Sequence, residues 1–196
     1  MKYERVTEEM DDLKEKVKIR RMILSAMFLA IAYVLPFFTG QIPQIGNMLC
    51  PMHIPVLLCG FIFGGGFGFL VGILAPLLRS VILGMPILFP MAVCMAFELG
   101  TYGMVSGILY RKFPKNKLYV YLSLVTAMVL GRLIWGAAMY LCLGVNGGSF
   151  SLNVFWTGAV TNAIPGIIIQ IILIPMIILA VQRWEYDDRN ERYKSE

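Results

Sequence analysis

The chain has 196 residues, of which 58% are hydrophobic and 15% charged, and its mean hydropathy is +0.73. Soluble domains carry about 25% charged residues, so this composition excludes a soluble globular protein and indicates an integral membrane protein. The net charge of +5 does not indicate nucleic-acid binding, because the basic residues gather at the ends of apolar segments, where they orient a protein in the bilayer.

Apolar runs predict an all-α membrane protein with six transmembrane helices in one bundle. A span needs about 20 mostly apolar residues to cross roughly 30 Å of hydrocarbon. The chain then divides into a cytoplasmic N-terminal segment (1–21), a transmembrane domain (22–182) and a cytoplasmic tail (183–196). The first segment reads equally well as a short surface helix or a solvated tail. The expected spans lie at residues 22–38, 52–63, from the glycines at 64–68 to 83, 89–110, 118–143 and 154–182.

The distribution of Lys and Arg predicts the orientation in the membrane. One basic cluster lies at residues 16–21, before the first span, and another at 111–117, after the fourth. The loops expected on the opposite side, at 39–51, 84–89 and 144–153, contain no Lys or Arg. Basic loops stay inside, so both termini are expected in the cytoplasm of a multi-pass protein of a bacterial-type plasma membrane.

Glu98 is the only carboxylate between Glu15 and Glu185. An acid inside a membrane usually pairs with a counter-charge or lines a pathway. The expected depth is about 12 Å below the outer surface. Arg79, in the outer part of the third span, and Arg132, near the middle of the fifth, are candidate partners, and we expect at least one of them to pair with Glu98.

Other polar side chains are expected at a similar depth. His53 begins the second span and Asn162 lies in the sixth, which suggests a pocket that opens outward. His53 fits a satisfied helix-end residue as well as a ligand contact, and Trp135 fits either a pocket wall or an interfacial aromatic. Two arginines against one acid leave a surplus positive charge, which favours an anionic ligand such as a carboxylate.

Enzymatic functions fit the sequence poorly. One acid and one histidine within the spans supply neither a paired-carboxylate site nor a metal site, and nucleophile-elbow, zinc-protease and Walker A motifs are missing. We expect no catalytic residue, no metal and no cofactor. The cysteines show no zinc or redox spacing and are expected as buried thiols; they are Cys50, Cys59, Cys94 and Cys142.

Small residues recur at four-residue spacing, which lets helix backbones approach closely in a membrane. The pairs are Ala26 with Ala30, Gly64 with Gly68 and Gly72, and Gly103 with Gly107. They predict packing inside the bundle or, alternatively, against a partner helix.

Residues 22–182 contain, in this order, the segments LSAMFLAIAYVLPFFTG, GFLVGILAPLLRSVILG, GRLIWG and TNAIPGIIIQ. The order of these segments resembles the substrate-binding S-components of energy-coupling factor (ECF) vitamin transporters. It implies a subunit that binds a vitamin from outside and assembles with a transmembrane coupling (T) protein and two cytoplasmic ATPases, which drive its rotation in the bilayer. Ala26 and Ala30 match the family's A-x-x-x-A contact with the coupling protein.

The resemblance also implies where the ligand lies. The first outer loop would cover the site, with Gln41, Gln44 and Asn47 as a lid, and the last helices would supply Glu98, Arg132 and Asn162. Arg79 would lie in the third helix, which contributes to the ligand site less consistently in the family. The sequence looks most like pantothenate-type members; cobalamin precursors such as ribazole or dimethylbenzimidazole, pyridoxine and hydroxymethylpyrimidine are further candidates. A stand-alone ion-coupled carrier and a non-binding structural membrane subunit remain alternatives.

Overall fold

A computed structural model describes residues 2–39, 50–114, 116–145 and 163–195. In these ranges the chain is helical and contains no strand. The helices are α1 (Lys2–Thr39), α3 (His53–Phe63), α4 (Gly65–Leu83), α5 (Val93–Lys112), α6 (Lys117–Val145) and α8 (Ile164–Ser195), with a short π-helical turn, η1 (Leu88–Ala92), before α5.

Five helices of the described chain are long and apolar enough to cross a membrane. They are the apolar parts of α1, α4, α6 and α8, together with η1 and α5 taken as one segment. The remaining helix, α3, has 11 residues and is therefore about 16 Å long, about half of a hydrocarbon core. The expected short second span is thus present as a helix, and the glycine break after it is confirmed, because Gly64 has a φ of 98° and separates α3 from α4.

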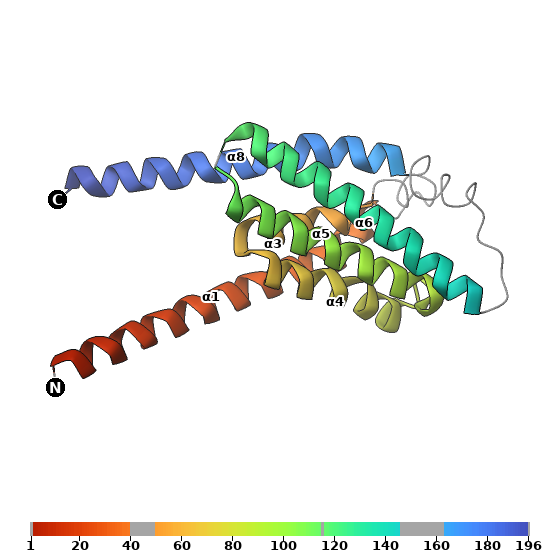
Figure 1. Cartoon of the computed structure of the whole chain (residues 1–196), viewed down its shortest axis with the longest axis horizontal. Helices are drawn as coiled ribbons and strands as arrows, with labels where there is room; N and C mark the ends of the chain where they lie inside the picture. The colour runs from red at the N-terminus through yellow and green to blue at the C-terminus, as the bar shows by residue number, and fades with distance from the viewer. Residues whose placement is uncertain (1, 40–49, 115, 146–162, 196) are drawn as a thin grey trace.

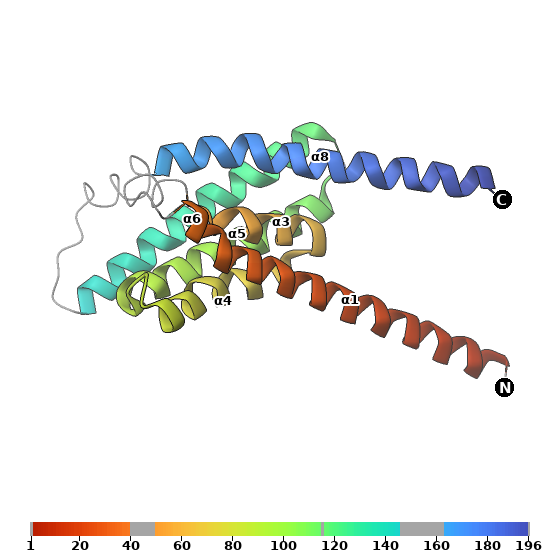
Figure 2. The same ribbon diagram turned by 180° about the vertical axis from the view of Figure 1, so that it is seen from behind.

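The two outermost helices extend beyond the bundle at the same end. Figure 1 shows α1 and α8 projecting together past the ends of α3, α4 and α5, and Figure 2 shows the same from behind. Residues 2–21 are therefore helical and continuous with the first span as one helix, which projects from the bundle. Helix α8 likewise continues past residue 182 into the predicted tail.

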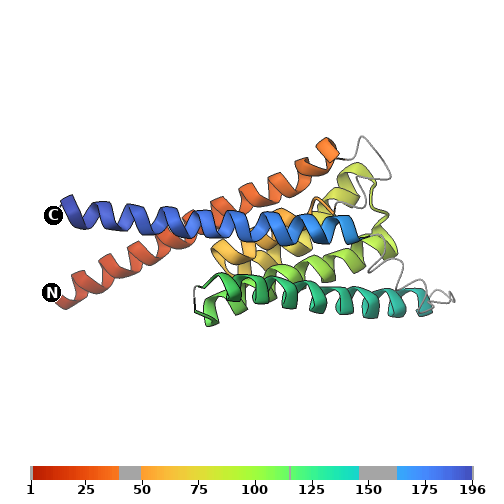
Figure 3. The ribbon, with the colours of Figure 1, turned by 90° about the horizontal axis from the view of Figure 1, so that it is seen from above.

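Helix α5 lies at the centre of the bundle, where it packs against α3, α4 and α6. In the view from above, α6 and α1 lie on opposite sides of it (Figure 3). One buried cluster joins α5 to α6 and α8 around Tyr102 and Leu124, and a second joins it to α1 and α4 around Leu99 and Ala32. Side chains of α3 contribute to both clusters.

Glycines bring α3, α4 and α5 into backbone contact. A Cβ added at Gly103 of α5 would overlap the backbone of Gly68 in α4, and one added at Gly60 of α3 would overlap the carbonyl of Gly103. At Gly72 an added Cβ would overlap the backbone of Leu99. The expectation that the glycine pairs serve packing inside the bundle is confirmed.

Candidate functional site

Glu98 lies on the buried face of α5 and is 2% exposed. Tyr102 stands one turn further along the same face, because residues four apart on a helix are neighbours. Its hydroxyl donates a hydrogen bond to Glu98 Oε1 over 3.0 Å. The acid therefore has one of its acceptor sites satisfied from within its own helix.

Arg132 of α6 supplies the counter-charge. Its Nη1 lies 3.0 Å from Glu98 Oε1, so the expected pairing of Glu98 with an arginine is confirmed for Arg132. Gly131 makes this approach possible, because a Cβ at that position would overlap the ring of Tyr102. The second terminal nitrogen of Arg132 lies 4.0 Å from the sulfur of Cys50, just before α3. Residues from three separate parts of the chain thus meet at one point.

His53, at the first position of α3, completes the cluster. Its Nε2 lies 3.5 Å from Glu98 Oε1, beyond a normal hydrogen-bond length, and its ring meets the ring of Tyr102 edge-on, with 5.3 Å between the centroids. The side chain is 3% exposed, and neither imidazole nitrogen has a hydrogen-bond partner among the described residues. The same is true of Arg132 Nε. Buried polar atoms without partners cost about 1–3 kcal/mol each, so a ligand that satisfied them would gain affinity.

The cluster offers both kinds of hydrogen-bonding group in one place. Glu98 is an acceptor, Arg132 is a donor, and His53 can act as either. Since the acid and the arginine neutralise each other, their ion pair carries no net charge. The arrangement suits recognition of a polar molecule, and its residues stand on helices rather than on loops, which holds their geometry closely.

Arg79 lies elsewhere in the structure, and its described contacts are with α1. Its Nη1 donates to the carbonyl oxygen of Tyr33 over 3.1 Å, and its guanidinium carbon is 5.3 Å from the centre of the Phe37 ring. Arg79, the surplus positive charge that the sequence suggested for the pocket, therefore makes its described contacts between α4 and α1. Counting residues along a helix places both Arg79 and Glu98 in the outer half of the membrane but does not tell which way Arg79 faces.

Comparison with known families adds an independent observation. Residues 20–178 match the family model described as ECF transporter, substrate-specific component. The chain belongs to this family. No curated protein and no solved structure was found to match it. Membership makes the chain a substrate-binding subunit of an ECF transporter, a multi-pass membrane protein that works with T and ATPase subunits.

In this ECF S-component, Ala26 and Ala30 lie on the exposed side of α1, whereas the neighbouring Ser25 and Ala32 face the bundle. Because both side chains are exposed, this side of α1 is open to another helix. Trp135 is 8% exposed and packs with Cys94 and Met139 in a small apolar cluster, one turn beyond Arg132.

Four residues proposed for the ligand site lie outside the described residues. They are Gln41, Gln44 and Asn47 of the first loop and Asn162 before α8. Their roles stay predictions.

Sequence reasoning missed two polar contributors to the cluster, Tyr102 and Cys50, and did not consider Gln170, a further buried polar side chain. Tyr102 could have been found from its position four residues after Glu98. Cys50 was considered only as a thiol, although it contacts Arg132. Gln170 of α8 is 1% exposed, and its Oε1 has no hydrogen-bond partner among the described residues. A single amide within the apolar run 164–181 was the available signal.

Proposed function

We propose that this S-component binds a water-soluble vitamin or vitamin precursor from outside the cell for import. The observation that carries the proposal is the buried cluster of Glu98, Arg132 and His53, which presents unsatisfied polar atoms within the membrane-embedded bundle of a substrate-binding subunit. Ionisable groups at such depth are costly and usually serve function. The protein itself is not an enzyme; partner ATPases supply the energy.

The sequence and the structure support different ligands within this class. The sequence resemblance favours pantothenate, an anion with one carboxylate. The charge balance favours uncharged ligands, because Arg132 is already paired and Arg79 contacts α1. Pyridoxine, hydroxymethylpyrimidine and the cobalamin precursors carry ring nitrogens or hydroxyls that could exchange hydrogen bonds with Glu98 and His53. All of these candidates belong in one binding panel.

Binding by the isolated protein tests the proposal. Purified protein in detergent, without ATP and without an ion gradient, is screened by thermal unfolding against the vitamin panel, and co-purified small molecules are identified by mass spectrometry. A ligand at 100 times its dissociation constant adds about 2.7 kcal/mol of stability. No response to any compound and no co-purified ligand would favour a structural subunit, and gradient-driven uptake by this chain alone in liposomes would favour an ion-coupled carrier.

Assembly is proposed to use the face of α1 that carries Ala26 and Ala30. Its support is the exposure of both side chains and their four-residue spacing, which suits close helix contact in lipid. The partner would be the transmembrane coupling protein, with two ATPase subunits bound to it, in a bacterial-type plasma membrane.

A further inference from the structure

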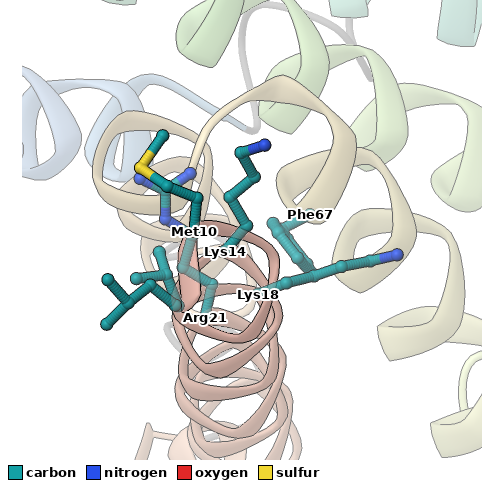
Figure 4. A pocket seen from close by; sticks show the side chains of 7 residues that line it. Met10, Lys14, Lys18, Arg21 and Phe67 are labelled. Carbon is teal, nitrogen blue, oxygen red and sulfur yellow. The ribbon is translucent and has the colours of Figure 1, made fainter. Parts of the chain in front are cut away.

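A groove lies beside α1 where its N-terminal extension meets the first span. Its volume is about 410 Å³, and none of the residues that line it belongs to the Glu98 cluster. Its lining comes from α1 and from the start of α4: Met10, Leu13, Lys14, Val17, Lys18, Arg21 and Phe67. Figure 4 shows the side chains of Lys14 and Lys18 extending past Phe67.

The groove combines cations with apolar side chains and contains no acid. The acids of this part of α1 do not line it; they are Glu8, Glu9, Asp11, Asp12 and Glu15. Lys14 pairs with Asp11 over 2.9 Å, but both side chains are well exposed, and such surface pairs contribute little. The three basic groups of the groove therefore stay available to an anion.

An apolar stripe runs through the groove. Val6, Met10, Leu13 and Val17 recur at three- and four-residue spacing and are each 49–59% exposed. Residues at this spacing share one face of a helix. The N-terminal extension thus presents an apolar stripe with basic residues beside it, and no described helix covers that stripe.

The positions of its residues in the chain put the groove at the expected edge of the membrane. Arg21 directly precedes the first apolar residue of the span, and Lys18 and Lys14 follow about 4.5 and 10 Å further out along the helix. The headgroup region of each leaflet is about 5–7 Å thick, and long basic side chains extend along the helix to reach it. Phe67, three residues into α4, is a groove residue that belongs to the bundle.

We propose that this groove binds one anionic phospholipid. Lys14, Lys18 and Arg21 hold the headgroup phosphate, while the glycerol and the first methylenes of the acyl chains pack on Val17 and Phe67. Juxtamembrane basic clusters attract anionic lipids at about 1 kcal/mol per residue, and basic pockets beside membrane helices bind their headgroups. The charge of the lining and its depth favour a lipid over an acidic protein, since the lipid is present at that level of the membrane.

Two matched double variants test the site. Lys14→Gln/Lys18→Gln removes two positive charges from the groove and one exposed ion pair. Lys16→Gln/Arg20→Gln also removes two charges and one exposed ion pair, that of Lys16 with Asp12, but neither residue lines the groove. Native mass spectrometry of the detergent-purified full chain, titrated with palmitoyl-oleoyl phosphatidylglycerol or the matching phosphatidylcholine, gives the lipid affinities.

We expect phosphatidylglycerol to bind the unaltered protein more tightly than phosphatidylcholine does. The groove variant should lose about 30-fold in affinity, the effect of removing two basic residues near the membrane surface, and the control variant much less. Equal losses of phosphatidylglycerol affinity in the two variants would mean that the lipid is attracted to the charged surface in general, and would overturn the proposal. Competition by millimolar inorganic phosphate would show that no acyl contact is needed and would also overturn it.

The apolar half of the site has its own test. Val17→Gln should weaken phosphatidylglycerol binding, whereas Val6→Gln, at a similarly exposed position of the same stripe outside the groove, should not. Both positions are exposed, so both variants are expected to fold, which circular dichroism and gel filtration check. If Val17→Gln left lipid affinity unchanged while an acidic protein partner protected Lys14 and Lys18 from labelling, the groove would be a protein-binding surface.

Discussion

Replacing Glu98 by glutamine perturbs the cluster with the least change of shape. The carboxylate is 2% exposed and is held by Arg132 and by Tyr102, each at 3.0 Å from Oε1. Glutamine keeps the volume but removes the charge, which leaves the guanidinium of Arg132 without its counter-charge. Breaking a buried ion pair from one side costs about 3–5 kcal/mol. We expect Glu98→Gln to lower the free energy of unfolding by this amount.

A double-mutant cycle measures the pair itself. Arg132→Gln should also destabilise, and the double variant Glu98→Gln/Arg132→Gln should cost no more than the worse single variant, because no unpaired charge remains. The coupling free energy would then be at least as large as the smaller of the two single costs. Reversible unfolding in mixed detergent and sodium dodecyl sulfate micelles, followed by circular dichroism, gives the values. Single costs below about 1 kcal/mol that simply add would refute the reasoning, since they would mean that water solvates the pair.

Three further outcomes are expected. Gly103→Ala should destabilise by about 1–3 kcal/mol or more, because its Cβ would overlap the backbone of α4, whereas Gly66→Ala, with no heavy atom within 4 Å of the added Cβ, should be neutral or slightly stabilising in the same unfolding assay. Ala30→Leu should abolish co-purification with the coupling protein and ATPases but spare ligand binding, whereas Arg132→Ala should lower ligand affinity but spare co-purification. Equal effects of the two variants on ligand binding would contradict these separate roles. His53→Phe should reduce ligand affinity in titration calorimetry with little loss of stability, because neither imidazole nitrogen makes a hydrogen bond to a described residue and the contact with Glu98 is 3.5 Å long; a large loss of stability would show a structural role instead.

The helices and the central ion pair could be predicted because charge is scarce in this chain. Long apolar runs indicate membrane helices, and a single acid among them needs a cation nearby. The predicted span 118–143 lies within α6, and the predicted break at the glycines lies at Gly64. The same scarcity left only two arginines to consider, of which one pairs with Glu98.

The direction in which a side chain points was harder to predict. Counting residues gives the depth of Arg79, but the packing of α1 on α4 decides that it turns to the carbonyl of Tyr33. Helical periodicity gives little help here, because nearly every position of these helices is apolar and no polar face marks the outside. The lid residues and Asn162 add nothing to this comparison, since they lie outside the described ranges.

The short helix α3 has an electrostatic consequence. Its first residue, His53, reaches Glu98 with its side chain, so the positive end of the α3 macrodipole lies within one side-chain length of the carboxylate. That end is equivalent to about half an elementary charge and stabilises a nearby anion. Glu98 therefore keeps a favourable field if Arg132 is lost, whereas Arg132 gains nothing from the same dipole if Glu98 is lost. The two halves of the ion pair should be unequal, and the acid should tolerate the loss of its partner better than the arginine does.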